Sequence, residues 1–155
     1  MSETKRGIFE DDEGNCCVIC PSPNALKNGA VLSEIFAKAA GGKSVDVIEG
    51  SELPNDRYFR NAWKKGTNIV SVDMPKARDI QMGIIREKRN EKLQEADIEW
   101  QREVESELLG NDVTVKKTSI ANKKQTLRDL PATFDLTTAT TPEELKLMIP
   151  TELTE

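Results

Sequence analysis

The sequence predicts an α+β protein: a small N-terminal β-α-β cap over residues 1–72, a long antiparallel helical hairpin over residues 73–131, and a short C-terminal tail helix within residues 132–155. Three observations support this prediction. Short runs of β-favouring residues alternate with turn residues in the first 72 positions. Between Pro75 and Gly110, only Gly83 interrupts a helical pattern. A second helical segment follows Gly110 directly, so we expect it to run back along the first.

The cap is expected to fold in the order strand, strand, helix, strand, strand. Residues 29–40 have apolar positions at helical spacing and end at two glycines, which predicts the helix. Residues 64–68 have the composition of a turn. Alternating or β-branched residues predict the strands, which we expect at Ile8 and Phe9 and over residues 16–21, 44–48 and 69–72.

Three cysteines lie close together at positions 16, 17 and 20. One interpretation is a metal or redox site that includes Cys17 and Cys20. The other is a buried strand whose thiols act as small hydrophobic groups. A zinc site needs a fourth ligand, and the chain has no other cysteine and no histidine. A redox motif lies at a helix N-terminus, whereas β-favouring residues and Pro21 surround this one. We therefore prefer the strand, and no cofactor or metal is expected.

Two other segments of the cap allow a functional interpretation. Residues 41–44 read Gly-Gly-Lys-Ser, but a phosphate-binding loop needs a strand before it and a helix after it, and neither fits here. Residues 54–63 combine arginines with aromatic residues, which could stack on nucleic-acid bases. A core corner built from Phe59 and Trp63 is the preferred interpretation of this cluster.

The first helix of the hairpin begins at Asp73, a favourable N-cap, with Pro75 in its first turn. At a rise of 1.5 Å per residue, a helix over residues 73–109 would be about 55 Å long. Charged residues between the apolar positions are expected to face solvent. One face has a residue at every third or fourth position, and all but Arg89 are apolar. Its apolar members are Met82, Ile85, Leu93, Ala96, Trp100, Val104 and Leu108.

The second helix is expected to follow the turn at residues 109–112, where Gly110 ends one helix and Asp112 caps the next. We expect it to end at Pro131, with lysines 116, 117, 123 and 124 directed outward. Its few apolar residues make two helices alone marginal, which indicates burial against a partner chain or another copy. The residues expected to bind the partner are Trp100, Val104, Leu108, Leu93, Ile120 and Leu127.

The tail is expected to hold one short helix. Thr141 is a favourable N-cap, Pro142 occupies the first turn, and acidic residues follow. Leu145, Met148 and Ile149 would dock this helix, and Pro150 would end it.

Composition restricts the classes of partner. Charged residues make up 32% of the chain and aromatic residues 5%, and the net charge is −5. Nucleic acids and anionic membranes need clustered lysine and arginine, so neither is an expected partner. No apolar stretch has the length of a membrane span, and residues 1–7 lack the apolar core of a signal peptide. We expect a protein that stays in a cytoplasm or leaves it within an assembly.

Five segments together resemble small structural or assembly proteins of the tail and tail-fibre module of tailed bacteriophages. They are residues 56–63 (DRYFRNAW), 72–80 (VDMPKARDI), 85–89 (IREKR), 124–131 (KQTLRDLP) and 139–145 (ATTPEEL). Residues 89–131 are also similar to the C-terminal region of phage tail-fibre assembly chaperones. In those proteins an arginine-rich helix leads to Ala-Asp-Trp, whereas here Ile98 follows Ala96 and Asp97, and the tryptophan stands at position 100. A proline-containing loop of the chaperones is replaced by a longer first helix.

The resemblance implies a non-enzymatic, virion-associated phage protein, a tail or tail-fibre structural component that binds other phage structural proteins or copies of itself. The alternative is a tail or tail-fibre assembly chaperone that is not retained in the virion. The expected location is the virion or the host cytoplasm, and the expected state is an oligomer. An enzyme would need carboxylates such as Glu99 and Asp129 to converge in a pocket. A nucleic-acid-binding module would depend on Arg57, Arg60 and Lys64-Lys65.

Overall fold

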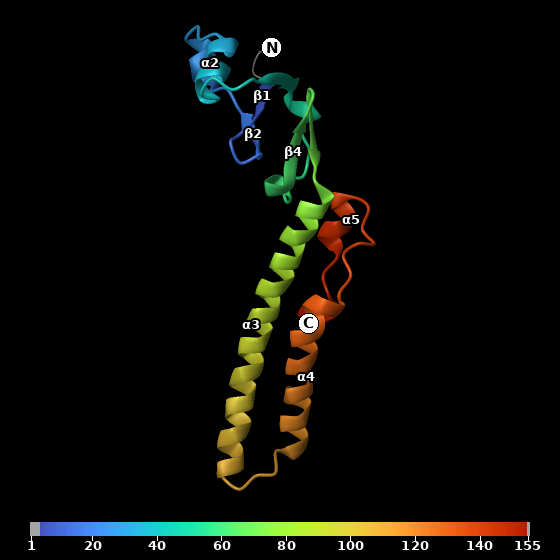
Figure 1. Ribbon diagram of the computed structural model, residues 1–155. Helices are drawn as coiled ribbons and strands as arrows, with labels where there is room; N and C mark the ends of the chain where they lie inside the picture. Colours follow the sequence, from blue (N-terminus) through green and yellow to red (C-terminus); the bar gives the residue numbers. More distant parts are fainter. Residues whose placement is uncertain (1–3, 155) are drawn as a thin grey trace. The chain divides into compact units, whose positions relative to one another are not determined.

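The computed structural model describes residues 4–154 and confirms the α+β class (Figure 1). The chain separates into two compact units that divide between Ala77 and Arg78. The first unit contains the strands and two short helices. The second contains most of the long helix, the returning helix and the tail, so the tail belongs to the same unit as the hairpin.

A three-stranded antiparallel sheet organises the first unit. Its order is β2-β1-β3, with β1 (Lys5–Glu10) between β2 (Cys16–Ile19) and β3 (Asp46–Glu49). A separate antiparallel pair, β4 (Trp63–Gly66) and β5 (Ile69–Val72), packs through β4 against β1 and β2. The shared core consists of Ile8, Ile48, Trp63 and Val70.

Strand β4 lies where the sequence predicted a turn over residues 64–68. That prediction is wrong because cross-strand pairing outweighs the low β propensity of the two lysines. Lys65 pairs with Val70, and its ammonium group lies 2.7 Å from the Asp46 carboxylate. The turn itself is shorter and includes Asn68 in the left-handed conformation (φ 52°).

The predicted single helix over residues 29–40 is also wrong in its extent. Within that range only α2 (Leu32–Ala39) is helical, with Val31 at its N-cap. A separate helix that was not predicted, α1 (Pro23–Lys27), ends before Gly29, which adopts a φ of 83°. Phe36 of α2 is buried close to Gly7 of β1. A Cβ atom at Gly7 would lie 2.9 Å from the Phe36 ring, so this contact requires glycine.

The segment between β3 and β4 contains two single-turn 3₁₀ helices, η2 (Gly50–Glu52) and η3 (Arg60–Ala62). Phe59 and Trp63 are buried, which confirms the predicted core corner. Tyr58 packs edge-on against the Phe59 ring with centroids 4.7 Å apart. The arginines of this segment, Arg57 and Arg60, are exposed.

The second unit is a helical hairpin followed by a docked tail. Helix α3 (Met74–Leu108) is capped by Asp73, whose side chain accepts a hydrogen bond from the Lys76 backbone N–H. Helix α4 (Thr114–Thr133) returns along α3 (Figure 1). It does not end at Pro131, which lies inside its last turn. A proline removes one backbone donor there without ending the helix, and Phe134 forms the C-cap.

The tail contains α5 (Pro142–Leu147) and a final 3₁₀ turn, η4 (Thr151–Leu153). Thr141 and Glu144 form the reciprocal N-terminal capping box that the sequence predicts. The helix ends at Leu147, before Pro150. Within this unit, α3 holds the tail through Arg78 Nη2, 3.1 Å from the Ala139 carbonyl oxygen, and through the fully buried Gln81, 3.0 Å from that of Met148. Leu136, Leu145 and Leu153 are buried with it.

Candidate functional site

The predicted partner-binding residues lie on the helical hairpin, and its seam contains few apolar side chains. Ile85 and Ala96 are fully buried on α3, while the apolar side chains buried on α4 are Ile120, Leu127 and Leu130. Val113 is buried in the turn. This small core is consistent with the predicted thin apolar face of the second helix.

Ion pairs join the rest of the two helices. All four lysines predicted to point outward reach carboxylates of α3. Lys116 and Lys123 are exposed as predicted, whereas Lys117 and Lys124 are half-buried, so the prediction is wrong for these two. Their long side chains span the gap between the helices that small and polar residues leave open. The pairs are Lys124–Asp97 at 2.5 Å, Lys117–Glu107 at 2.9 Å, Lys123–Glu99 at 3.4 Å and Lys116–Glu103 at 3.5 Å.

Trp100 is half-buried and faces two of these lysines. The Nζ atom of Lys117 lies 5.0 Å from the centroid of the ring, and that of Lys124 lies 5.9 Å away. Both distances are compatible with cation–π attraction. Side chains of α4 therefore cover part of the Trp100 ring.

The six predicted partner-binding residues fall into three groups by exposure. Ile120 and Leu127 are covered within the hairpin, at 8% and 2% exposure. Leu93, Trp100 and Val104 are half-buried. Leu108 is 83% exposed and is the only one of the six that stands free of the chain's own core. Their role in partner binding stays a prediction.

The turn of the hairpin exposes two more aliphatic side chains that sequence reasoning missed. Leu109 is 82% exposed and Val115 is 84% exposed. Leu109 follows the last residue of α3 directly. An apolar residue in so short a turn has nothing in its own chain to pack against, and this could have indicated its exposure. We call Leu108, Leu109 and Val115 the hairpin tip.

The turn is held by backbone hydrogen bonds. Gly110 adopts a φ of 89°, and its N–H and that of Asn111 donate to carbonyl oxygens of the last turn of α3. The Asp112 carboxylate accepts a hydrogen bond of 3.0 Å from the Thr114 backbone N–H, which lowers the pKa of Asp112. This confirms the predicted role of Gly110. The prediction that Asp112 is the N-cap is wrong by one residue, because Val113 occupies that position and Asp112 accepts the Thr114 N–H from the residue before it. The turn therefore presents the hairpin tip from an ordered backbone.

A groove of about 480 Å³ lies beside the tip, between α3 and α4. The Glu103 Oε2 atom is buried and has no hydrogen-bond partner among residues 4–154, although Oε1 of the same carboxylate contacts Lys116. A donor from another molecule would satisfy this oxygen. The groove is lined by Glu99, Arg102, Glu103, Val115, Lys116, Ser119 and Ile120.

The carboxylates that an enzyme would need each have their own partners. Glu99 contacts Lys123, and both Asp129 oxygens accept hydrogen bonds from the Gln125 side chain. Within the described residues, no group of three histidine, cysteine or acidic side chains has the arrangement of a metal site.

Cys16 and Cys17 belong to β2, which confirms a strand here, but the prediction that it is buried and extends through Cys20 is wrong, because β2 is half-buried and ends at Ile19. Cys16 and Cys17 are half-buried and Cys20 is exposed, and all three are free thiols. Burial raises the pKa of Cys16 and of Cys17, so both thiols are protonated at neutral pH. The glycines at 41 and 42 end α2 in left-handed conformations, and β3 follows them instead of the helix of a phosphate loop.

Comparisons with known proteins give no relative. No family model matches the chain, and no curated protein or solved structure is detectably similar to it. In the part of the chain that the structure describes, none of the helices is long and apolar enough to span a membrane.

Proposed function

We propose that this chain is a non-enzymatic, virion-associated bacteriophage protein that acts through contacts between its helical hairpin and another polypeptide. The observation that carries the protein-binding part is the hairpin tip. Leu108, Leu109 and Val115 are each more than 80% exposed at one ordered turn. Single exposed leucines are common in proteins, but three exposed aliphatic residues at one turn favour an interface.

The groove beside the tip adds a polar anchor to this interface. An interface typically combines an apolar centre with hydrogen bonds at its edge. The unpartnered oxygen of Glu103 would accept from a lysine, arginine or backbone N–H of the partner. The partner is either another phage structural protein or a second copy of this chain.

The phage assignment is supported by the resemblance of residues 56–63, 72–80, 85–89, 124–131 and 139–145 to proteins of the tail and tail-fibre module. The resemblance implies a structural component of a tail or tail fibre, and this is the form of the function that we propose first. Mass spectrometry of purified particles tests this directly, because a component is found at constant stoichiometry after each purification step. Absence from particles would reject the structural form.

The second candidate is a tail or tail-fibre assembly chaperone that leaves before the virion is complete. The few apolar side chains of the hairpin seam favour it, since the exposed pairs Lys116–Glu103 and Lys123–Glu99 contribute only about 0–1 kcal/mol each to holding the helices together. In that case the chain is found with unassembled fibre or tail protein in the lysate and not in particles.

A matched pair of variants tests the interface itself. Leu108→Lys places one charge at the hairpin tip, and Leu147→Lys places one charge at a leucine of nearly the same exposure on α5. We expect the tip variant to lose co-purification with its partner and the control to keep it. Equal co-purification by both would reject the tip as the contact.

A further inference from the structure

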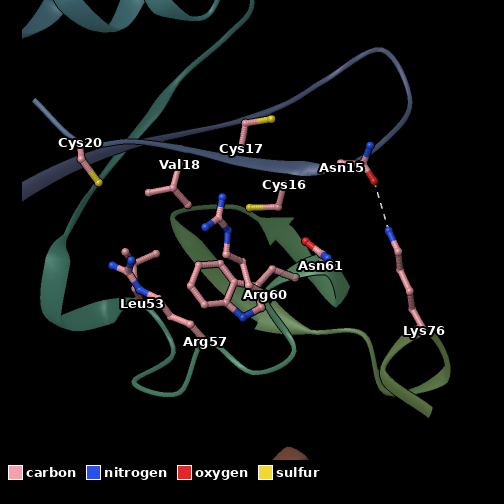
Figure 2. Close-up of a pocket in the computed structure, with 11 residues that line it drawn as sticks. Asn15, Cys16, Cys17, Val18, Cys20, Leu53, Arg57, Arg60, Asn61 and Lys76 are labelled. Carbon is pink, nitrogen blue, oxygen red and sulfur yellow. Dashed lines mark hydrogen bonds between the residues drawn. The ribbon is translucent and has the colours of Figure 1, made fainter. Parts of the chain in front are cut away.

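We propose that a pocket in the first unit binds an acidic, partly apolar peptide segment of a partner protein, independently of the hairpin. The pocket has a volume of about 670 Å³, within the range of known ligand sites. Figure 2 shows it between the cysteine-containing strand β2, the segment that carries Arg57 and Arg60, and the start of α3. Its walls consist of Asn15, Cys16, Cys17, Val18, Cys20, Leu53, Arg57, Arg60, Asn61, Trp63 and Lys76.

The charges of the pocket are all of one sign. Arg57, Arg60 and Lys76 line it, and no aspartate or glutamate does. Lys76 donates a hydrogen bond of 3.1 Å to the Asn15 side chain, which holds its ammonium group at the pocket (Figure 2). Within residues 4–154, the guanidinium groups of Arg57 and Arg60 have neither a hydrogen-bond nor an ion-pair partner. Arginine binds carboxylates in a bidentate geometry, so an anion is the complementary ligand.

A buried donor adds a second, independent observation. Trp63 lines the pocket and is only 6% exposed, and its Nε1 atom has no acceptor among the described residues. Buried indole N–H groups usually have an acceptor.

The other walls require an apolar group on the ligand. Val18, Leu53 and Trp63 are the pocket's apolar lining residues, and the thiols of Cys16 and Cys17, which also line it, are protonated. Protonated thiols behave as small hydrophobic groups. Inorganic phosphate would pair with the arginines but would leave these apolar walls in contact with water. A carboxylate attached to an aliphatic side chain satisfies both sides.

The pocket continues into a second depression of about 440 Å³, which shares Leu53 and Arg57 with it. Arg6 lines this second depression. Its one acidic wall residue, Glu49, is already paired with Lys5 and with the Thr4 hydroxyl. Two adjoining depressions with a shared arginine suit an extended chain better than a compact small molecule.

The test measures binding of labelled peptides to the full chain by fluorescence anisotropy. The probes are acetyl-Leu-Glu-Leu-Glu-amide and its uncharged analogue acetyl-Leu-Gln-Leu-Gln-amide, each with a fluorescein label, and inorganic phosphate serves as a competitor. The pocket variant is Arg57→Gln with Arg60→Gln. The control variant, Lys27→Gln with Lys38→Gln, removes the same charge from exposed positions of the same unit that do not line the pocket.

We expect the acidic peptide to bind and the glutamine peptide to bind about tenfold more weakly, as the loss of two exposed ion pairs predicts. The pocket variant is expected to lose a similar factor for the acidic peptide, and the control variant to bind it as the unchanged chain does. Circular dichroism checks that both variants fold. Equal binding of the two peptides, unchanged binding by the pocket variant, or displacement by phosphate at peptide-like concentrations would overturn the proposal. Variants of the hairpin tip do not enter this measurement, so its failure leaves the proposed function untouched.

Discussion

The hairpin tip gives the most quantitative prediction. Truncating Leu108 and Leu109 to alanine removes about three methylene equivalents from each side chain. Burial contributes about 0.8 kcal/mol per methylene, and more than four-fifths of each leucine is still exposed in the free chain, so about 2 kcal/mol per leucine is available to a partner. Loss of one leucine should therefore weaken association by roughly 30-fold. Folding stability should change by less than about 0.5 kcal/mol, because surface substitutions rarely exceed that value.

The assay compares the unchanged chain with the Leu108→Ala, Leu109→Ala and Leu147→Ala variants. Sedimentation equilibrium gives the dissociation constant for self-association, and urea unfolding gives the free energy of unfolding. Leu147→Ala is the control, since this leucine is equally exposed but lies on α5. Two results would refute the reasoning. One is association of the tip variants that matches the control, and the other is a drop in folding stability as large as the drop in association.

Three further predictions follow from packing and electrostatics. Trp100→Ala should weaken oligomer or partner binding more than it lowers the unfolding free energy of the first unit. Urea unfolding measures that free energy, and an equal loss of it would contradict the interface role. Gly7→Ala should cost about 1–3 kcal/mol of stability because its Cβ would lie 2.9 Å from a buried aromatic ring. Gly83→Ala, whose Cβ would have open space around it, should stabilise the helix by up to about 1 kcal/mol. Thermal unfolding measures both changes, and a gain in stability for Gly7→Ala would reject the packing argument. A hydrogen bond from Lys65 lowers the pKa of Asp46, so the ionised Asp46 carboxylate stabilises the fold above pH ~4, and this stabilisation is lost as the pH falls through the lowered pKa. Asp46→Asn should therefore make the free energy of unfolding depend less on pH in that acidic range. Urea unfolding midpoints that change with pH as steeply as those of the unchanged chain would disprove this prediction.

Local signals were sufficient to predict much of the fold. Gly110 and Asp112 identify the turn of the hairpin because their backbone roles depend on immediate neighbours. The capping box at Thr141 is equally local. Phe59 and Trp63 are large and apolar, so their burial follows from side-chain size.

Features that depend on residues far apart in the sequence were missed. Strand β4 contains two lysines, and it is stabilised by pairing with β5 and by Asp46, 19 residues before Lys65. From the sequence alone, the lysines of α4 are predicted to face solvent, because their ion-pair partners on α3 lie far away in the sequence. Periodicity shows which side of a helix is apolar, but not that two helices meet along a largely charged seam.

The pocket could not be predicted from the sequence either. Its walls come from β2, the segment before β4 and the first turn of α3, and only folding brings Arg57 together with Lys76. The sequence did indicate the cysteines and the arginine–aromatic segment as unusual. The sequence gave no reason to expect the cysteines and the arginine–aromatic segment to line the same pocket.

Cross-linking mass spectrometry with an amine-reactive reagent tests the central claim most directly, because Lys116 and Lys117 lie next to the hairpin tip. Applied to purified particles and to lysate complexes, it should give links from these lysines to another polypeptide or to a second copy of the chain. Links from Lys116 and Lys117 that stay within one chain in both preparations would contradict the account.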